Sequence, residues 1–424
     1  MQYTFASFSF GCRVNHAEKQ RFDQELLALG YVYDNANPNI YIINTCAVTA
    51  KAERGVRQFI YQIKKKLPNC KIILTGCAAT FWQQNKINNK LPIDLVIPNS
   101  DKEKLCETIN KLCHPEPSLT LKGSNDKFLQ SGRYLLKIQD GCPRFCSYCI
   151  VPYLRGKPKS TLIKNLKFQI LNLNPYIKEV VLTAINTEAF GNDTGETLIG
   201  LIQTTLNTTN ISRISFGSIH PWSINTELLN YYKTIANNPR FVNFFHIPLQ
   251  SGCNRILKFM KRDYSIKDIR NKIYELNSIN PRALIATDII VGFLDETDSD
   301  FDKTYKLLEE LPISKFHVFK FSKRSHTAAD FMAKQMTEPT PQEKNKRSQS
   351  LIALGNKKYQ KFLQTLVGWK SSALMIGDVN DGYQTGLLEN QVPVMVKTNK
   401  NLLGQIKLVK TLQLKYDKLI GELI

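Results

Sequence analysis

In the first 115 residues of the chain, short apolar runs rich in β-branched and aromatic residues alternate with longer helix-like stretches. The short runs are typical of buried strands, and the longer stretches are typical of helices that cover a sheet. The expected strands are Tyr3–Phe10, Ile40–Ile43, Lys71–Leu74 and Asp94–Ile97. The expected helices are Ala17–Leu29, Ala50–Leu67 and Lys102–Leu112. This alternation predicts an open α/β fold with a parallel sheet.

A segment rich in Pro, Ser, Gly and Asn follows at His114–Asp126 and predicts a linker. The alternation then resumes at a longer period. The six strands expected there are Tyr134–Ile138, Glu179–Thr183, Arg213–Ser218, Phe244–Leu249, Leu284–Val291 and Phe316–Phe321. The helices expected between them include Leu162–Leu173, Thr226–Ile235, Ile266–Leu276 and Phe301–Leu311. Six strand–helix units predict a partial (β/α)6 barrel, with functional groups at the C-terminal ends of its strands.

The last part of the chain begins with a basic helical stretch after Pro341, in which residues 341–370 carry seven Lys or Arg and one acidic residue. Short strand-like runs follow, separated by Asn, Asp and Gly. They are Ser372–Ile376, Val392–Val396 and Gln405–Val409. This pattern predicts a small all-β barrel. The expected domains are therefore residues 1–115, 128–362 and 363–424.

Composition narrows the class of protein. The 424 residues are 42% hydrophobic and 22% charged, as in a folded globular protein. No apolar run approaches the roughly 18 residues of a membrane-spanning helix, and the N-terminus lacks a secretion signal, so we expect a cytoplasmic protein. The net charge of +21 favours a polyanionic partner, with nucleic acid first, although a codon bias toward Lys, Asn and Ile would also produce it. In this setting the ten cysteines indicate metal ligands or buried thiols rather than disulfides.

Three cysteines, Cys142, Cys146 and Cys149, form a C-x-x-x-C-x-x-C pattern directly after the first expected barrel strand. Three thiolates on one short loop can hold three irons of a [4Fe–4S] cluster and leave the fourth iron open. A structural zinc site would need a fourth ligand, and no further Cys or His lies nearby in the sequence. A two-cluster ferredoxin would use a tighter spacing and a fourth Cys. The pattern therefore predicts an open-site cluster.

Three further cysteines, Cys12, Cys46 and Cys77, each come just after an expected strand of the N-terminal sheet. The C-terminal ends of parallel strands meet at one edge, where open α/β sheets bind ligands. The three thiols are therefore expected to converge and to hold a second cluster. The alternative is three buried cysteines, because Cys often behaves as a small hydrophobic residue.

Seven motifs carry a resemblance to a known family. They are GCRVNHAE at 11–18, NTCAVTAKAE at 44–53, TGCAA at 75–79, the 142–149 loop with RG at 155–156, HIPLQSG at 246–252, TDIIVGF at 287–293 and FHVFKFSKRSHTAA at 316–329. Over nearly its whole length the chain resembles the methylthiotransferase family of radical S-adenosylmethionine (SAM) enzymes.

The resemblance implies two [4Fe–4S] clusters, one on each set of three cysteines, and two SAM molecules per turnover. One SAM methylates a sulfur of the N-terminal cluster. The other binds the central cluster, where Tyr148 contacts its adenine, and provides the radical that abstracts hydrogen from C2 of an adenine base. Such a reaction also implies an electron donor such as flavodoxin or ferredoxin.

The resemblance also implies a substrate. C-R-V-N and N-T-C-A-V-T are most similar to the branch that modifies N6-threonylcarbamoyladenosine in the anticodon loop of tRNA, and the tail is similar to the RNA-binding TRAM domain. The alternatives are action on isopentenyladenosine tRNA or on a ribosomal protein aspartate. Non-enzyme alternatives are a two-cluster electron carrier and a nucleic-acid-binding protein that has lost its chemistry.

Some positions depart from the family pattern or have other interpretations. Pro143 stands in place of Asp, Ala184 and His326 in place of Gly, and Leu294 and Asp295 in place of Pro-Gly. These changes put SAM binding near them in question. His246 and His317 are expected to be packed or hydrogen-bonded in the barrel wall. Gln250 and Ser251, at a strand end, are candidate cofactor or substrate contacts.

Overall fold

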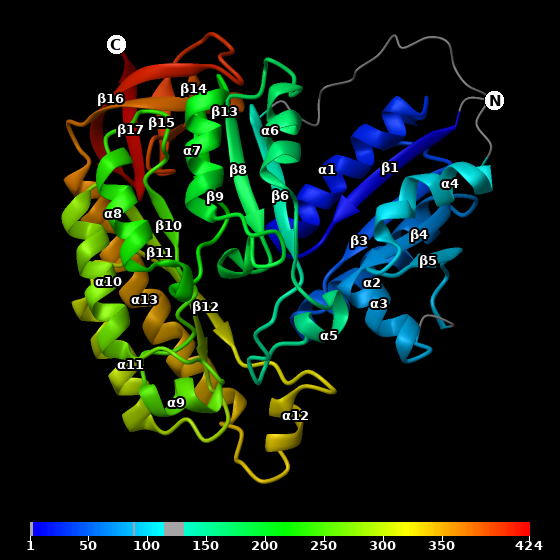
Figure 1. Cartoon of the computed structure of the whole chain (residues 1–424), viewed down its shortest axis with the longest axis horizontal. Helices are drawn as coiled ribbons and strands as arrows, with labels where there is room; N and C mark the ends of the chain where they lie inside the picture. Colours follow the sequence, from blue (N-terminus) through cyan, green and yellow to red (C-terminus); the bar gives the residue numbers. More distant parts are fainter. Residues whose placement is uncertain (1–2, 88–89, 114–130) are drawn as a thin grey trace. The chain divides into compact units, whose positions relative to one another are not determined.

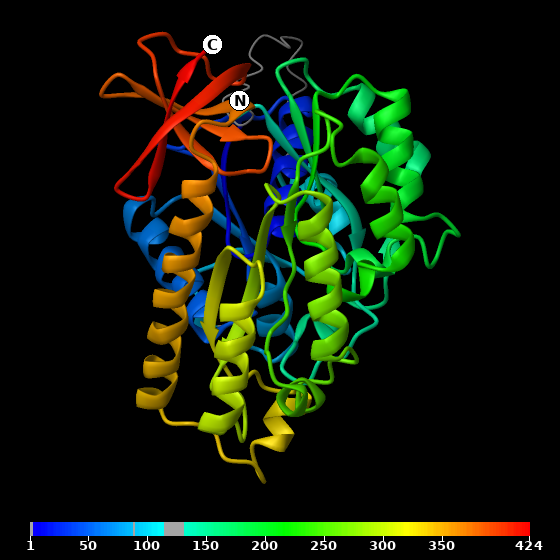
Figure 2. The ribbon, with the colours of Figure 1, turned by 90° about the vertical axis from the view of Figure 1, so that its left-hand side faces the viewer.

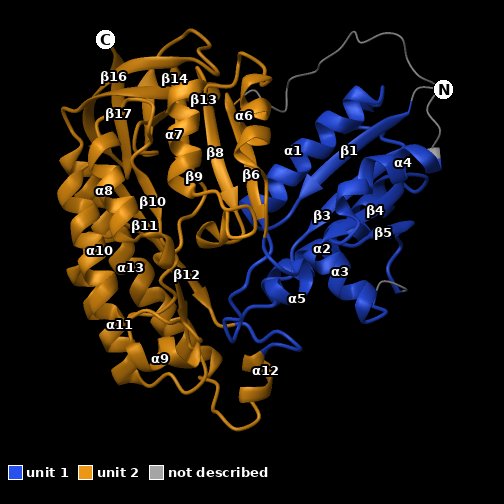
Figure 3. Ribbon diagram, in the orientation of Figure 1, with its two compact units in different colours: residues 1–128, 140–158, 322–327 blue, residues 129–139, 159–321, 328–424 orange. Residues whose placement is uncertain are grey.

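The computed structural model describes residues 3–87, 90–113 and 131–424, which form two compact units (Figure 3). Unit 1 comprises residues 1–128, 140–158 and 322–327, and unit 2 comprises residues 129–139, 159–321 and 328–424. The expected linker His114–Asp126 lies outside the described residues, and the division into three domains stays a prediction. Within the part of the chain that is described, every helix is too short or too polar to cross a lipid bilayer.

Unit 1 contains a five-stranded parallel sheet with helices on both faces (Figure 1). Its strand order is β2-β1-β3-β4-β5. The strands are β1 (Thr4–Ser9), β2 (Val32–Tyr33), β3 (Ile40–Thr45), β4 (Lys71–Gly76) and β5 (Leu95–Ile97), and the helices are α1 (Arg13–Ala28), α2 (Ala50–Lys66), α3 (Cys77–Gln84) and α4 (Leu105–Cys113). The central strand β3 shows why the sheet forms. Ile40 and Ile42 pack in the core under α1 and α4, whereas Tyr41 and Ile43 pack under α2 and α3. The predicted open parallel sheet is confirmed.

Unit 2 contains six parallel strands of a partial barrel with helices packed on one face. The strands are β6 (Arg133–Asp140), β8 (Glu179–Ala184), β9 (Arg213–Phe216), β10 (Phe244–His246), β11 (Leu284–Val291) and β12 (Lys315–Lys320), with the short β7 (Lys159–Ser160) at the edge. A parallel bridge between Ile214 and Phe241 links its two sheets. The main helices are α6 (Ile163–Leu171), α7 (Leu198–Thr208), α8 (Thr226–Ile235), α10 (Ile266–Ile279) and α11 (Asp298–Glu310). Their apolar faces and the strands share one large core.

The C-terminal part of unit 2 is the long helix α13 (Pro341–Thr365) followed by a closed five-stranded barrel (Figure 2). The barrel strands are β13 (Lys370–Asn380), β14 (Tyr383–Leu388), β15 (Pro393–Lys397), β16 (Ile406–Lys415) and β17 (Lys418–Leu423). Thr340 caps α13 in a capping box with Glu343, and Pro341 occupies the first turn. Val242 and Ala286 of the partial barrel pack with the core of the C-terminal barrel, so the two parts share buried surface. The predicted small all-β barrel is confirmed.

The structure extends the sequence prediction in a few places. Helix α1 begins at Arg13 rather than Ala17, and Cys12 is its N-cap residue. The sequence pattern does not reveal β2, β14 or β17. Each mixes polar with apolar residues or is very short, and hydrogen bonds to neighbouring strands hold it in place.

Gly76 at the end of β4 offers a test of the close packing at this edge of the sheet. Its φ is +94°, and a Cβ there would lie 2.4 Å from the backbone oxygen of Thr45. We expect Gly76→Ala to lower the free energy of unfolding by about 2–5 kcal/mol, because left-handed backbone strain and overpacking add. Denaturant unfolding followed by circular dichroism measures this loss.

The matched control is Gly195→Ala. Gly195 also has a positive φ, of +75°, but a Cβ there meets nothing within 4 Å. This variant therefore carries the backbone strain alone, at about 1–2 kcal/mol. Equal losses for the two variants would contradict the close approach of β4 to Thr45.

Candidate functional site

The thiols of unit 1 gather at the edge where its parallel strands end. Cys12 caps α1 just after β1, Cys46 directly follows β3, and Cys77 begins α3 directly after β4. The register of the sheet brings these ends level, since Ser9 pairs with Asn44 and Thr45 pairs with Gly76. Cys46 and Cys77 are buried, and Cys12 is exposed. The three cysteines therefore share one edge of the sheet.

The Cys46 thiol is closely packed at this edge. Gly11 has a φ of +91°, and a Cβ there would fall 2.5 Å from the Cys46 sulfur, so only glycine allows this approach. Burial raises the pKa of the Cys46 thiol to about 12. Cys77 and Cys12 raise this pKa further, and the guanidinium of Arg155 lowers it. A metal bound here would displace the thiol protons, because thiolates are the ligands.

Arg155 is the centre of the polar network beside these thiols. It ends α5 (Val151–Arg155), and its side chain is only 1% exposed. Its Nη1 donates to Glu18 Oε1 at 2.9 Å and to Asp140 Oδ1 at 2.8 Å. Its Nη2 donates to Asn15 Oδ1 at 2.6 Å, and its Nε donates to the Cys77 sulfur at 3.4 Å. One side chain thus connects the start of α1, the end of β6 and a candidate ligand.

A second buried cation completes the network. Lys102 Nζ lies 2.7 Å from Glu18 Oε2, and both side chains are nearly fully buried. Burial lowers the pKa of Lys102. Burial also works against the charge of Arg155, but the carboxylates of Glu18 and Asp140 outweigh it and hold the Arg155 pKa well above its usual value. The two cations, Arg155 and Lys102, are therefore balanced by the two carboxylates, Glu18 and Asp140, so the network carries no net charge.

The sequence pattern assigns no individual role to most of these polar residues. Asn15 Nδ2 donates to the backbone oxygens of Phe10 and Thr45, and Asn44 Nδ2 donates to Glu18 Oε2. One feature of the sequence could have indicated them: Asn15 and Glu18 are polar residues three positions apart on α1, so they share one helix face. Both are buried, and buried polar groups of this kind need specific partners.

The second set of cysteines lies on the loop between β6 and α5. Cys146 is buried, and Cys142, Tyr148 and Cys149 are half-buried. The backbone N–H of Cys142 donates to the oxygen of Gly156 at 3.2 Å, which closes the loop. Residues 140–158 belong to unit 1, so both cysteine sets are part of one compact unit. Arg155 follows this loop and contacts Cys77, which ties the loop to the first set of thiols.

Comparisons with known proteins identify the family of the chain. Residues 4–98 match the "Uncharacterized protein family UPF0004", and residues 136–308 match the "Radical SAM superfamily". A "Threonylcarbamoyladenosine tRNA methylthiotransferase MtaB" of Aquifex aeolicus is 32% identical, over 87% of this chain and 92% of the relative. The protein of that name from Chlamydia pneumoniae is 32% identical, over 99% of this chain and 98% of the relative. The chain belongs to the methylthiotransferase family of radical SAM enzymes.

Two further similarities extend these findings. A "tRNA-2-methylthio-N(6)-dimethylallyladenosine synthase" of Lachnoclostridium phytofermentans is 30% identical, over 99% of this chain and 95% of the relative. Among solved structures, a radical SAM methyltransferase, TsrM, from Kitasatospora setae has a TM-score of 0.55 at 11% identity and covers 76% of this chain and 75% of its own. The structural similarity supports the fold. The family resemblance predicted from the motifs is confirmed.

A radical SAM enzyme uses SAM and a [4Fe–4S] cluster, and the central loop fits that cluster. The loop of residues 140–158 carries three cysteines and no other Cys or His. A [4Fe–4S] cluster held by these three cysteines would have one iron open to a small-molecule ligand.

Two positions that depart from the expected family pattern have positive φ values in this chain. Asp295 and His326 both stand where the family has Gly, and both have positive φ values, of +53° and +67°. Asp tolerates this region, and its carboxylate also accepts from the Thr337 N–H at 2.6 Å. Leu294 is fully buried. Asp295 thus adopts this backbone conformation without being glycine, and an effect on SAM affinity stays a prediction for Ala184, Leu294, Asp295 and His326.

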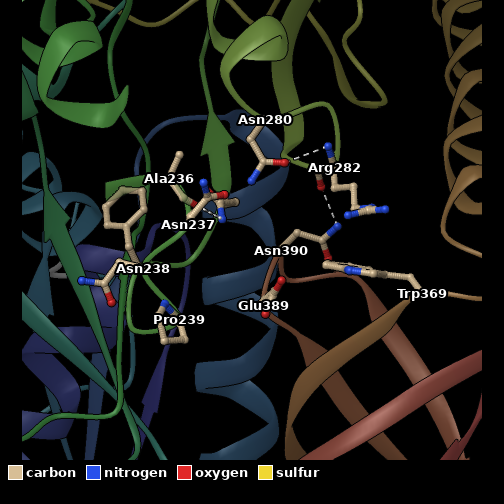
Figure 4. A pocket seen from close by; sticks show the side chains of 11 residues that line it. Ala236, Asn237, Asn238, Pro239, Asn280, Arg282, Trp369, Glu389 and Asn390 are labelled. Atoms are coloured by element: carbon tan, nitrogen blue, oxygen red, sulfur yellow. Dashed lines mark hydrogen bonds between the residues drawn. The ribbon is translucent and has the colours of Figure 1, made fainter. Parts of the chain in front are cut away.

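A pocket of about 180 Å³ lies where the partial barrel meets the C-terminal barrel (Figure 4). The Arg282 guanidinium lies 5.5 Å from the ring centre of Trp369, and Asn390 Nδ2 donates to the Arg282 backbone oxygen at 2.8 Å. These contacts come from both barrels and join them. We interpret the pocket as part of this junction.

The Arg155 network predicts a strong effect of one substitution. We expect Arg155→Met to lower the free energy of unfolding of unit 1 by about 3–5 kcal/mol, because it removes the buried cation that pairs with Glu18 and Asp140. Denaturant unfolding of the wild-type and variant proteins measures the change. Lys111→Met is the control, since it breaks an ion pair with Glu107 in which both side chains are mostly exposed. The control is expected to leave the unfolding midpoint unchanged, and equal effects would contradict the importance of the buried network.

Proposed function

We propose that this protein is a tRNA methylthiotransferase that attaches a methylthio group to C2 of N6-threonylcarbamoyladenosine next to the anticodon. The observation that carries this proposal is the similarity, over nearly the full length, to proteins named for that activity. The thiols gathered in unit 1 supply the ligand chemistry that such a reaction requires. Acid–base groups alone would not open a C2–H bond of adenine, so the hard chemistry belongs to cofactors.

We propose that Cys142, Cys146 and Cys149 hold the radical SAM cluster and that Cys12, Cys46 and Cys77 hold a second [4Fe–4S] cluster. When bound, these groups supply SAM cleavage to a carbon radical and the sulfur that is transferred. The support for the second site is the common strand edge and the mutual influence of its thiols. Tyr148 is the candidate contact for the adenine of SAM.

The chain's own residues prepare the second site. The Arg155 Nε–H donates to the Cys77 sulfur at 3.4 Å, and this hydrogen bond from a cationic side chain helps to fix the position of the sulfur. Asn99 Nδ2 also faces this sulfur, at 3.7 Å. Hydrogen bonds to ligand atoms orient them and tune the bound metal. Arg155 is therefore a positioning residue for the proposed second cluster.

The proposed tRNA contact rests on charge in unit 2. Lys346, Lys357 and Lys361 of α13 and Lys370 of β13 are exposed. Lysines of this kind contact phosphates and position an RNA without reading its sequence. The adenine would be splayed out of the loop for modification, as bases usually are in RNA recognition. We also propose that a flavodoxin or ferredoxin supplies the electron and that the enzyme acts in the cytoplasm.

Nucleoside analysis tests the substrate. We expect tRNA from cells that lack the gene to lose 2-methylthio-N6-threonylcarbamoyladenosine and to retain the unmethylthiolated nucleoside, because the C2 substitution is the last step proposed here. Mass spectrometry of digested tRNA measures both species, with the restored gene as the control. Loss of a methylthio group from isopentenyladenosine or from a ribosomal protein, with this nucleoside unchanged, would contradict the proposal.

Iron content tests the second cluster. After anaerobic reconstitution we expect about eight irons per chain, and about four when Cys12, Cys46 and Cys77 are all replaced by Ala. The triple variant is expected to cleave SAM to 5′-deoxyadenosine but to make no methylthio product. Cys70→Ala is the matched control, because Cys70 is a buried thiol of unit 1 outside both sets, and it should keep about eight irons. About four irons in the wild-type protein would contradict the second cluster.

A further inference from the structure

Three side chains from three adjacent strands of unit 2 meet at one point. His246 ends β10, Asp288 lies in β11 and His317 lies in β12. The Asp288 Oδ1 is 2.8 Å from His246 Nε2 and 3.1 Å from His317 Nδ1, and the two imidazole nitrogens are 3.3 Å apart. The three ligand atoms all lie within 4.8 Å of one another. Among the described residues, no other group of three or more His, Cys, Asp or Glu side chains meets this criterion.

The strand pattern places this cluster on the face of the sheet opposite the helices. Ile285 and Ile289 of β11 belong to the core that packs against α10 and α11. Leu284 and Ala286 alternate with them and belong to the core shared with the C-terminal barrel. Asp288 has the same parity as Leu284 and Ala286, so it faces the same side of the sheet. The cluster therefore lies above this apolar layer on the inner face of the partial barrel.

The cluster is accessible on this face. The His246 side chain is 12% exposed, Asp288 is 22% exposed and His317 is 40% exposed. A site that is enclosed on one side by an apolar layer and open on the other can admit an ion together with further small ligands. The two histidines were expected to be packed or hydrogen-bonded, and their partner is a carboxylate shared by both.

The distances match those of a three-ligand metal site. Ligand atoms that lie about 2.0–2.2 Å from one metal are about 2.8–3.4 Å apart when their angles at the metal are between roughly 85° and 110°. All three separations in the cluster fall in this range. The other ring nitrogen of His246, Nδ1, lies 2.7 Å from Ser218 Oγ. A partner of this kind on the far nitrogen is usual for histidines that bind metals, because it fixes the tautomer and the ring orientation.

We propose that His246, Asp288 and His317 bind one divalent first-row transition ion, of the class that includes Zn²⁺ and Fe²⁺. Two imidazoles and one carboxylate are ligands that suit these ions, and three protein ligands leave coordination positions open to water or to an oxygen atom of a substrate. The site contains no cysteine. It belongs to unit 2, whereas the cysteines proposed as cluster ligands belong to unit 1.

Zinc binding to the reconstituted holoenzyme tests this proposal. Iron is first loaded anaerobically, loosely bound metal is removed with a chelator and desalting, and ZnCl₂ is then titrated against a chromophoric competitor. We expect one zinc per chain. X-ray absorption at the zinc edge is expected to show only nitrogen and oxygen neighbours at about 2.0–2.1 Å, without the sulfur at about 2.3 Å that cysteine ligands would give.

Variants separate the proposed site from other zinc sites. His246→Gln and His317→Gln each remove one ligand and are expected to weaken binding by more than about 100-fold, and Ser218→Ala by about tenfold. His16→Gln, which changes an exposed histidine of unit 1, is the matched control and should bind zinc as the wild type does. Wild-type affinity in His317→Gln, a sulfur shell, or no zinc bound would overturn the proposal and leave the cluster a hydrogen-bonded group. These outcomes do not depend on the tRNA substrate.

Discussion

The buried guanidinium of Arg155 is the interaction on which the arrangement of both cysteine sets depends. Removing such a charge from water costs several kcal/mol, and this cost is met only where carboxylates and hydrogen bonds surround it. Glu18 and Asp140 provide these partners from the start of α1 and the end of β6. The loop that carries Cys142, Cys146 and Cys149 therefore packs with the N-terminal sheet in unit 1, although β6 itself pairs with the strands of unit 2.

The parallel sheet provides the second constraint. Three cysteines far apart in the sequence share one edge because β1, β3 and β4 run in the same direction and end level with one another. Space at this edge is limited, and Gly11 and Gly76 allow backbone to approach backbone and sulfur where any Cβ would collide. The family motifs that contain these cysteines thus combine ligands, glycines and the polar residues that hold Arg155. These three kinds of residue lie close together, so a change in one is expected to affect the others.

Local patterns explain which features were predictable. Strand β11 and helix α8 have the bounds expected from the sequence, because their apolar residues repeat with the period of the element they form. The positions of Cys12, Cys46 and Cys77 after strands were also predictable, whereas their role as cluster ligands stays a prediction. The role of Arg155 was not predictable, because Glu18 lies 137 positions away along the chain and no local pattern reports such a contact. The cluster of His246, Asp288 and His317 was not predicted for the same reason, because its residues meet only when three strands pair.

The proposed cluster sites and the proposed histidine–carboxylate site use donor atoms of different kinds, and this difference limits how metals can be distributed between them. Thiolates are soft ligands that suit iron–sulfur clusters, whereas imidazole and carboxylate suit single borderline ions. The six cysteines proposed as cluster ligands lie in unit 1, and the one histidine–carboxylate cluster found among the described residues lies in unit 2. An ion at His246, Asp288 and His317 would therefore compete little with cluster assembly once the thiolates are loaded. Because the ligand types are separated, one chain could hold iron–sulfur clusters on its thiolates and a single ion on its imidazole and carboxylate groups.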